Sequence, residues 1–277
     1  MTSPLNAELR ASFVGDGYVV IPGVFGSAEL QPAIETITAF ARADLADPTT
    51  WYRLRPDSWS VVPVHHAQAF WDLRQDPRLV SIYADLLGTE RLWVTMDRAG
   101  FKPPVSARHP LHQQETKIHW DEDPRRPGPR GLQGLIYLTD VGAGDGGFEC
   151  VPSLYRELDG WLAKHPTATR PEVAGRERVE VTGKAGDVVI WSARLPHRGG
   201  INRGTSPRLT FYTSYFPEGP EADRSERIEN WRQNRPPTWW RGWVDQVDPE
   251  PGPSAQLTPL GRRLLGVDRY LSGRSDR

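Results

Sequence analysis

From about Leu92 to Phe216 the chain consists of short runs of β-favouring residues separated by turn residues. The runs read RLWVTMD, TKIHWD, LQGLIYLTD, FECVP, RVEVTGKAGDVVIWS and RLTFYTSYF, and the segments GAGDGG (142–147) and GKAGD (183–187) are typical of tight turns. Many short strands bounded by Gly, Pro and Asp indicate an antiparallel sandwich or barrel. The pattern therefore predicts a mainly β core with flanking helices.

Helical patterns precede this β region. A short strand, Tyr18–Ile21, lies between glycine-containing turns, and apolar residues then recur at helical spacing after Ser27, which is a suitable N-cap. The span 66–87 contains a second helix, with Pro77 near its start and Gly88 just past its end. Helices followed by antiparallel strands give an α+β order within one domain.

We expect one domain over 1–277, because a chain of this length suits a single β barrel with additions. The helical part covers 27–88, the β core about 92–216 and a C-terminal extension 218–277. The extension begins with a highly charged segment, and its tail is amphipathic enough to dock on the barrel.

Composition excludes several classes of protein. The net charge of −1 gives no bulk attraction to nucleic acid or to an anionic membrane. No apolar run approaches the roughly 18 residues of a membrane span, and the N-terminus does not resemble a secretion signal. The single cysteine, Cys150, excludes an internal disulfide and fits a reducing compartment. We therefore expect a cytoplasmic protein with a small-molecule partner; its oligomeric state stays open.

The segment KIHWDED (117–123) contains the first candidate metal ligands. In a strand, residues two apart point to the same face, so His119 and Asp121 would project together. A His-x-Asp or His-x-Glu pair is expected about once by chance in a chain of this composition, so the pair alone decides little. The ordered context matters more, because a strand, a turn and another strand lead to His197 in a following loop.

Two imidazoles and one carboxylate form a set that binds Fe(II) and leaves three coordination positions open. The same set of ligands also occurs in zinc sites. The simplest alternative is a surface ion pair between His119 and Asp121 with an unrelated His197.

Arg208 heads the next predicted strand, eleven residues after His197. A guanidinium can form two parallel hydrogen bonds to a carboxylate in a buried site, which suits a dicarboxylic cosubstrate. Lys117 shares a face with His119 if that strand is regular, and it is one of only four lysines. Gln133, at the start of its strand, is a candidate for a hydrogen bond in the same pocket.

Four further residues are candidates for the substrate side of the pocket. Trp191 precedes His197 by six residues and would wall the pocket or pack in the core. His65 and His66 are adjacent, so in a strand they point oppositely and cannot both ligate one metal; they are candidates for the substrate entrance. His112 lies in a predicted loop before the metal segment.

The stretch from about Gly15 to Phe216 resembles the phytanoyl-CoA dioxygenase family of Fe(II)- and 2-oxoglutarate-dependent oxygenases. DGYVVIPGVF is similar to the family's first strand, and HWD matches its His-x-Asp. GLIYLTDVGAGDGGFECVPSLYR resembles its strand and Gly-Gly turn. GDVVIWSARLPHRGGINRGTSPRLTFYTSY resembles the segment with its distal His, Asn and Arg.

The resemblance implies a double-stranded β-helix (a jelly roll, cupin-like) with Fe(II) on His119, Asp121 and His197. It implies that 2-oxoglutarate chelates the iron and places its far carboxylate on Arg208. Asn202 matches a family Asn near the site.

The chain also departs from the family pattern in two places. PSLYR (152–156) stands where relatives often have a PGSH-like run. Gly199 stands where some relatives have a Ser that helps to hold the cosubstrate, and Thr210 or another hydroxyl is expected to compensate. In halogenating relatives a small residue replaces the metal-binding acid, so the presence of Asp121 favours hydroxylation over chlorination.

The expected function is an Fe(II)-, 2-oxoglutarate- and O2-dependent dioxygenase that oxidises a small molecule, most simply by hydroxylation, with release of succinate and CO2. A substrate from secondary metabolism such as antibiotic biosynthesis is favoured over a CoA thioester, because the sequence has no Gly-rich phosphate loop and no Lys/Arg cluster in its strands. Two alternatives are a non-catalytic β-barrel binding protein and a zinc hydrolase that uses the same three ligands.

Overall fold

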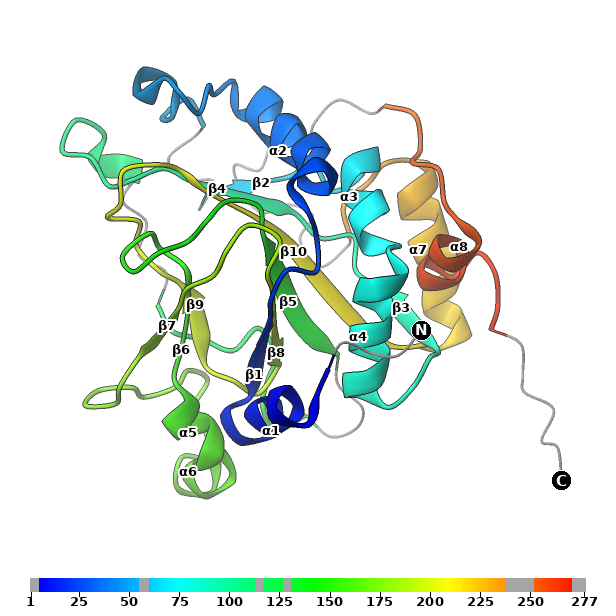
Figure 1. Cartoon of the computed structure of the whole chain (residues 1–277). Coiled ribbons are helices and arrows are strands. Elements are labelled where there is room, and N and C mark those ends of the chain that lie inside the picture. Colours follow the sequence, from blue (N-terminus) through cyan, green and yellow to red (C-terminus); the bar gives the residue numbers. More distant parts are fainter. Residues whose placement is uncertain (1–4, 55–59, 113–116, 127–130, 238–251, 271–277) are drawn as a thin grey trace, which may run out of the picture.

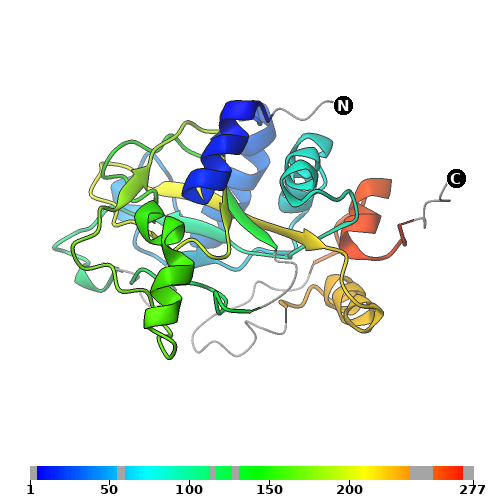
Figure 2. The ribbon, with the colours of Figure 1, turned by 90° about the horizontal axis from the view of Figure 1, so that it is seen from below.

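Two antiparallel β-sheets face each other, and helices cover the outer side of the larger sheet (Figure 1). The arrangement comes from a computed structural model that describes residues 5–54, 60–112, 117–126, 131–237 and 252–270. Figure 2 shows the same molecule from below, with β10 running through its middle between α6 at one end and α7 and α8 at the other. The two facing sheets confirm the predicted mainly β, jelly-roll core.

The larger sheet has the strand order β1-β8-β5-β10-β4-β2, and β3 pairs with β10 beside this path. Its strands are β1 (Tyr18–Ile21), β2 (Val61–Val62), β3 (Leu92–Val94), β4 (Ala99–Lys102), β5 (Leu132–Tyr137), β8 (Val188–Ser192) and β10 (Arg208–Pro217). The smaller sheet has the order β7-β6-β9. Its strands are β6 (Phe148–Cys150), β7 (Val179–Val181) and β9 (His197–Gly199).

The helices are α1 (Ala7–Asp16), α2 (Ser27–Ala41), α3 (Gln68–Arg74), α4 (Pro77–Leu87), α5 (Pro152–Arg156), α6 (Leu158–Lys164), α7 (Glu221–Arg232) and α8 (Pro259–Leu265), with 3-10 turns η1 (Pro48–Thr50) and η3 (Pro110–His112). Helix α4 has the predicted Pro77 in its first turn and a left-handed Gly88 at its end. Helix α2 begins at Ser27, but Gly26 is its N-cap residue, so the predicted cap lies one residue too late. The sequence pattern does not predict α1, because none of its residues is buried. None of the helices in the described ranges has the length and apolarity needed to cross a bilayer.

Side chains along β10 alternate between two environments, because successive residues of a strand point to opposite faces. Leu209 and Phe211 are fully buried in the apolar cluster under the helices. Arg208 and Thr210 point the other way, toward the small sheet, and are equally buried. A second apolar cluster fills the space between the sheets and includes Leu135, Tyr137, Phe148, Val189 and Trp191. The polar inner face of β10 therefore borders a closed interior.

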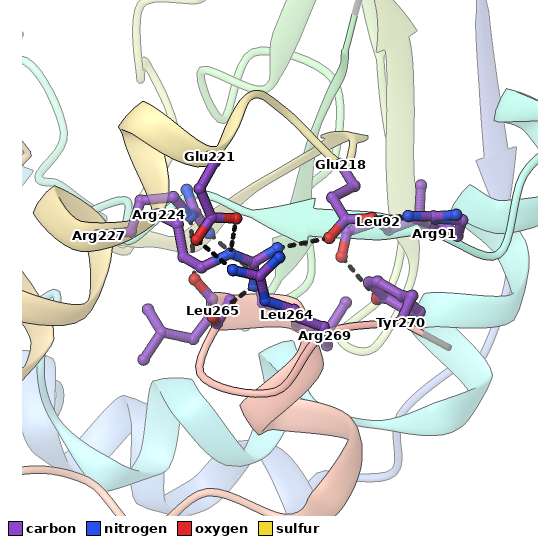
Figure 3. A network of polar contacts seen from close by, with 11 residues as sticks. Arg91, Leu92, Glu218, Glu221, Arg224, Arg227, Leu264, Leu265, Arg269 and Tyr270 are labelled. Carbon is purple, nitrogen blue, oxygen red and sulfur yellow. Dashed lines mark hydrogen bonds and ion pairs between the residues drawn. The ribbon is translucent and has the colours of Figure 1, made fainter. Parts of the chain in front are cut away.

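The C-terminal extension packs beside β3, as the amphipathic tail predicted (Figure 3). Arg224 and Arg227 of α7 donate hydrogen bonds to backbone carbonyls at the end of α8, where the last carbonyls of a helix lack partners of their own. Arg224 also pairs with Glu218 at 2.7 Å, and the Tyr270 hydroxyl donates to the Leu92 carbonyl at 2.6 Å. These contacts fix the extension on the sheet edge away from the β7-β6-β9 sheet.

Candidate functional site: a metal centre between the sheets

The three predicted metal ligands converge. Nε2 of His119 lies 3.3 Å from Oδ1 of Asp121, and Nε2 of His197 lies 3.2 Å from Oδ2 of the same carboxylate. One ligand atom from each residue lies within 4.8 Å of the other two. The backbones of His119 and His197 hold each other through two hydrogen bonds of 3.0 Å, although 78 residues separate them.

The local structure differs from the prediction at both histidines. Segment 117–121 is not a regular strand: it forms a single antiparallel bridge, at His119, with His197. Instead of strand pairing, the Trp120 indole anchors the segment by donating to the Arg194 carbonyl at 2.9 Å. His197 in turn begins strand β9, where a loop was predicted. The Lys117 side chain is consequently exposed, and its role in binding cosubstrate or substrate stays a prediction.

Both imidazoles are oriented by a backbone carbonyl. Nδ1 of His119 lies 2.8 Å from the Lys117 carbonyl oxygen, and Nδ1 of His197 lies 2.9 Å from that of Leu195. A carbonyl oxygen can only accept, so each Nδ1 carries the hydrogen and each Nε2 is left to face Asp121. Metal-binding imidazoles are held in this way, and the donor set therefore fits a divalent cation.

The charges of Asp121 and the two histidines influence one another's protonation. Burial alone would lower the pKa of His119, but the hydrogen bond to Asp121 and its negative charge outweigh burial and raise it. Burial would likewise raise the pKa of Asp121, but hydrogen bonds to both histidines hold it well below its usual range. The carboxylate thus stays ionised, and without a metal it favours a proton on the facing imidazole of His119. A metal cation would replace that proton.

A second group of polar residues lies on the inner face of β10 and the neighbouring β4. Arg208 is opposite Lys102 in the strand register, and Thr210 is opposite Gly100. A Cβ atom at Gly100 would lie 2.6 Å from Thr210 Oγ1 and 3.5 Å from a guanidinium nitrogen of Arg208, so the missing side chain leaves room around both. Arg208 Nε and Thr210 Oγ1 are buried and have no hydrogen-bond partner among the described residues. Buried polar atoms of this kind fit a bound carboxylate.

Lys102 is the residue of this group that the sequence did not single out. Its side chain is buried, and Nζ lies 2.5 Å from the Gly200 carbonyl oxygen. Burial, followed by the positive charges of Arg208 and Arg198, lowers the pKa of Lys102 to about 7. Two cationic side chains, side by side and buried, are stabilised by an anion between them.

Lys102 also lies close to Gly199, the position where some relatives have a Ser that helps to hold the cosubstrate. A Cβ atom at residue 199 would lie 3.5 Å from Lys102 Nζ, so the ammonium group lies next to the space that a side chain there would enter. The sequence offered one weak signal: Lys102 is one of four lysines and ends a run, AGFK, just before two prolines. Its partner strand, which brings it beside Arg208, is more than 100 residues away in the chain.

Asn202 fastens the loop that follows β9. Its Nδ2 donates to the Lys102 and Ser206 carbonyls at 2.9 Å each, and its Oδ1 accepts from the Gly204 amide at 2.9 Å. The side chain thereby ties the end of β4 to the loop. Direct contact between Asn202 and the cosubstrate stays a prediction.

Gln133 and Trp191 lie behind the triad. Gln133 Nε2 donates to Asp121 Oδ2 at 2.5 Å, and its Oε1 accepts from the Trp191 indole at 3.0 Å. Trp191 is only 4% exposed, which places it in the packed interior rather than at an open substrate wall.

The three candidate substrate histidines lie in two other places. His65 is buried; its Nδ1 lies 3.1 Å from the Pro63 carbonyl, and its own carbonyl accepts from Arg74 of α3. Burial, followed by the charge of the adjacent His66, lowers the pKa of His65 to about 4. His66 is half-buried, with its ring 5.2 Å from that of His65. A substrate role for either stays a prediction.

His112 lies in η3 and contacts another loop. Its Nε2 lies 2.9 Å from the Leu54 carbonyl, and its ring packs edge-on against Tyr52, with 5.5 Å between centroids. Its substrate role also stays a prediction.

Comparison with known proteins identifies the family. The sequence profile of the phytanoyl-CoA dioxygenase family matches residues 13–210, more than two thirds of the chain. The chain belongs to this family. It is a 2-oxoglutarate-dependent non-haem iron dioxygenase with Fe(II), 2-oxoglutarate and O2 as cofactors, which sets aside both the zinc hydrolase and the non-catalytic binding protein.

Relatives of this dioxygenase include an ectoine dioxygenase from Sphingopyxis alaskensis, 22% identical over 93% of this chain and 90% of the relative. Among solved structures, the epimerase SnoN in complex with Fe3+, α-ketoglutarate and nogalamycin RO has a TM-score of 0.55 and 19% identity, covering 91% of this chain and 94% of SnoN. HygX from Streptomyces hygroscopicus, with nickel, 2-oxoglutarate and hygromycin B bound, has a TM-score of 0.51 and 19% identity, covering 77% and 88%. These structural likenesses show a shared fold.

Proposed function

We propose that this dioxygenase hydroxylates a small molecule of secondary metabolism, with Fe(II) held by His119, Asp121 and His197. The observation that carries the proposal is the convergence of this triad at the small sheet, together with a buried cationic group on the facing inner side of the large sheet. When bound, the iron would supply the oxidising chemistry: one oxygen atom of O2 enters succinate as 2-oxoglutarate loses CO2, and the other enters a substrate C–H bond.

The protein's own contribution begins with orientation of the ligands. The Lys117 and Leu195 carbonyls keep both Nε2 atoms directed at one point, and the ionised Asp121 supplies the negative charge that a divalent cation needs. These three side chains would hold the cation and would leave coordination positions for cosubstrate and O2.

Arg208, Lys102 and Thr210 supply the second anchoring point. In our proposal the far carboxylate of 2-oxoglutarate accepts hydrogen bonds from the Arg208 guanidinium, the Lys102 ammonium and the Thr210 hydroxyl. Each of these side chains is at most 7% exposed, so water is excluded and charge-assisted hydrogen bonds there are stronger than at a surface. The cosubstrate is thereby held at both ends.

The substrate would approach from the solvent side of the triad. The side chain of His197 is 6% exposed, whereas those of His119 and Asp121 are 36% and 45% exposed. The site is therefore closed behind His197 and open beside the other two ligands, where loops rather than strands surround it. Loops on a rigid barrel can accommodate substrates of very different shape. Relatives named for ectoine and structures holding nogalamycin RO and hygromycin B support a small-molecule substrate.

Anaerobic addition of Fe(II) and 2-oxoglutarate tests the centre, because a chelated oxoacid gives a visible charge-transfer band. A panel of ectoine, hygromycin B and nogalamycin RO, assayed for succinate and by mass spectrometry, then tests the substrate class. We expect one compound class to raise succinate release above the uncoupled rate and to gain one oxygen atom. Absence of the band would contradict the metal assignment. A product that has lost two hydrogens or inverted a stereocentre would contradict hydroxylation but not the assignment of a dioxygenase.

A further inference from the structure

A chain of hydrogen bonds runs from the packed interior to the metal site. The Trp191 indole N–H donates to Gln133 Oε1 at 3.0 Å, and Gln133 Nε2 donates to Asp121 Oδ2 at 2.5 Å. Gln133 and Trp191 are direct partners in the register of β5 and β8, so their side chains lie next to each other on the inner face of the sheet. The three residues thus connect a rigid sheet to a ligand that lies in a loop.

The chemistry of the groups fixes the direction of both bonds. An indole N–H can only donate, so it selects the oxygen of the Gln133 amide. The amide NH2 group must then face Asp121, whose ionised carboxylate can only accept. The opposite amide orientation would place an oxygen against the carboxylate and leave the buried indole N–H without a partner. Trp191 therefore determines which end of Gln133 meets the metal ligand.

Trp191 also borders a second ligand. Its ring centroid lies 5.1 Å from that of His197 and 4.3 Å from that of Phe148, which itself packs on His197 at 5.6 Å. Trp191 thus contacts His197 through its ring and reaches Asp121 through Gln133.

Asp121 needs support more than the other two ligands. Each histidine is held by a carbonyl two residues before it, and both take part in the bridge between their backbones. Within the described residues, Asp121 forms no such bridge, and its side chain is the most exposed of the three, at 45%. Of the side chains in that part of the chain, only Gln133 and the two histidines hold its carboxylate.

We propose that Gln133 and Trp191 are positioning residues that hold the Asp121 carboxylate ready for the metal and thereby set the metal affinity of the site. The inference rests on the proposed function, since it assumes that the triad binds Fe(II). In this proposal Gln133 supports the metal ligand Asp121 instead of binding the cosubstrate. Trp191 orients Gln133 instead of contacting the substrate.

Titration of metal-free protein with Co(II), without 2-oxoglutarate, tests the proposal through affinity and through the visible spectrum of the ion. Gln133→Met keeps the length of the side chain and removes the donor, and we expect Co(II) to bind about 10- to 100-fold more weakly, with an altered spectrum. Trp191→Phe keeps a ring against His197 and removes only the N–H; we expect a loss of roughly threefold to tenfold. In the double variant the Trp191 substitution should add nothing, because it acts through Gln133.

Trp71→Phe is the matched control, because Trp71 is also fully buried but its Nε1 has no hydrogen-bond partner among the described residues. Its Co(II) affinity should equal that of the wild type. Wild-type affinity and spectrum in folded Gln133→Met would overturn the proposal, as would full additivity in the double variant. If Gln133→Met does not fold, Trp191→Phe decides: an affinity equal to that of Trp71→Phe overturns the inference. Failure of the wild type to bind Co(II) would instead contradict the proposed function.

Discussion

The large sheet has two faces, one packed against the helices and one turned toward the small sheet. Both faces come from the same strands, but they carry different kinds of side chain. On the helix side, β10 contributes Leu209 and Phe211, both fully buried among apolar neighbours. On the inner side, the alternating residues are Arg208 and Thr210, which are buried but have polar atoms without hydrogen-bond partners among the described residues. One strand therefore supplies packing with one set of residues and ligand-binding groups with the other.

Two buried arginines sharpen the contrast. Arg74, on the helix side, donates to the carbonyls of His65 and Asp97 at 2.7 and 2.6 Å and lies over the ring of Phe211. Arg208, on the inner side, lies beside Lys102. Nε of both arginines lacks a hydrogen-bond partner among the described residues, but Nη1 and Nη2 of Arg74 donate to carbonyls of the fold. The first guanidinium is largely satisfied by the fold, whereas the second is placed for a ligand. Burial alone does not separate these roles; the partners of each charge do.

The largest effect is expected at the metal ligands, which lie on the small-sheet side, facing the inner face of the large sheet. Asp121→Ala should lower the rate of succinate formation at least about a thousandfold, because losing the metal removes several kcal/mol of stabilisation from the reaction. Thermal stability should change little, because the Asp121 side chain is 45% exposed. Succinate assays with saturating Fe(II), together with thermal unfolding of the metal-free protein, measure both. A variant that keeps a tenth of the activity would show that Asp121 is not a ligand.

The next effect separates cosubstrate binding from catalysis. Arg208→Met should raise KM for 2-oxoglutarate by about a hundredfold, since truncating one partner of a buried charge pair costs a few kcal/mol. The free energy of unfolding without ligand should not fall, because the substitution removes a buried charge from beside Lys102. Initial rates at varied 2-oxoglutarate, and urea unfolding, give the two numbers. An unchanged KM would mean that the far carboxylate is held elsewhere.

Arg74→Met should lower the free energy of unfolding and leave KM for 2-oxoglutarate unchanged, the reverse of Arg208→Met. We expect the free energy of unfolding to fall by about 2 kcal/mol, because two buried carbonyls lose charged donors, while KM for 2-oxoglutarate stays at the wild-type value. Urea unfolding of this variant beside Arg208→Met makes a matched pair of Arg-to-Met changes. The contrast between the faces fails if both variants change the same quantity.

The sequence predicts the helix side of this contrast better than the inner side. Strand Tyr18–Ile21 and helix α4 follow from local patterns of apolar, Pro and Gly residues, so both agree with the structure. His119, Asp121, His197 and Arg208 follow from motifs in a familiar order.

Lys102 and the role of Gln133 do not follow, because each depends on a strand partner distant in the chain. For Lys102 that partner is Arg208, through the β4–β10 register, and for Gln133 it is Trp191, through the β5–β8 register. The bridge at His119 was also expected to be a strand, since i, i+2 spacing cannot distinguish a strand from an extended loop. The spacing of residues in the sequence is enough to predict the metal ligands. The residues that support those ligands and the cosubstrate can be found only when the strand register is known.

The smallest effect concerns the charge of Lys102. In the ligand-free chain its pKa is lowered to about 7, first by burial and then by Arg208 and Arg198, whereas its ordinary value is 10.5. Between these two values the unfolded chain binds more protons than the folded one, so this group makes the ligand-free protein more stable as pH rises from about 7 to 10.5. A bound carboxylate favours the ammonium form and would raise the pKa again. Binding of 2-oxoglutarate above pH 7 should therefore take up a proton.

The dissociation constant of 2-oxoglutarate should then rise with pH above 7, by up to about tenfold per pH unit, until the raised pKa of the complex is reached. Calorimetry at pH 8 in buffers of different ionisation enthalpy counts the proton, and the titrant itself is fully ionised there. Lys102→Met should abolish the proton uptake, whereas Lys184→Met, which removes an exposed lysine paired with Asp140, should keep it. Binding at pH 8 with no proton uptake by the wild type would show that Lys102 does not contact the anion. Arg208 would then be the cation that holds it, and the polar inner face would depend on one charged residue instead of two.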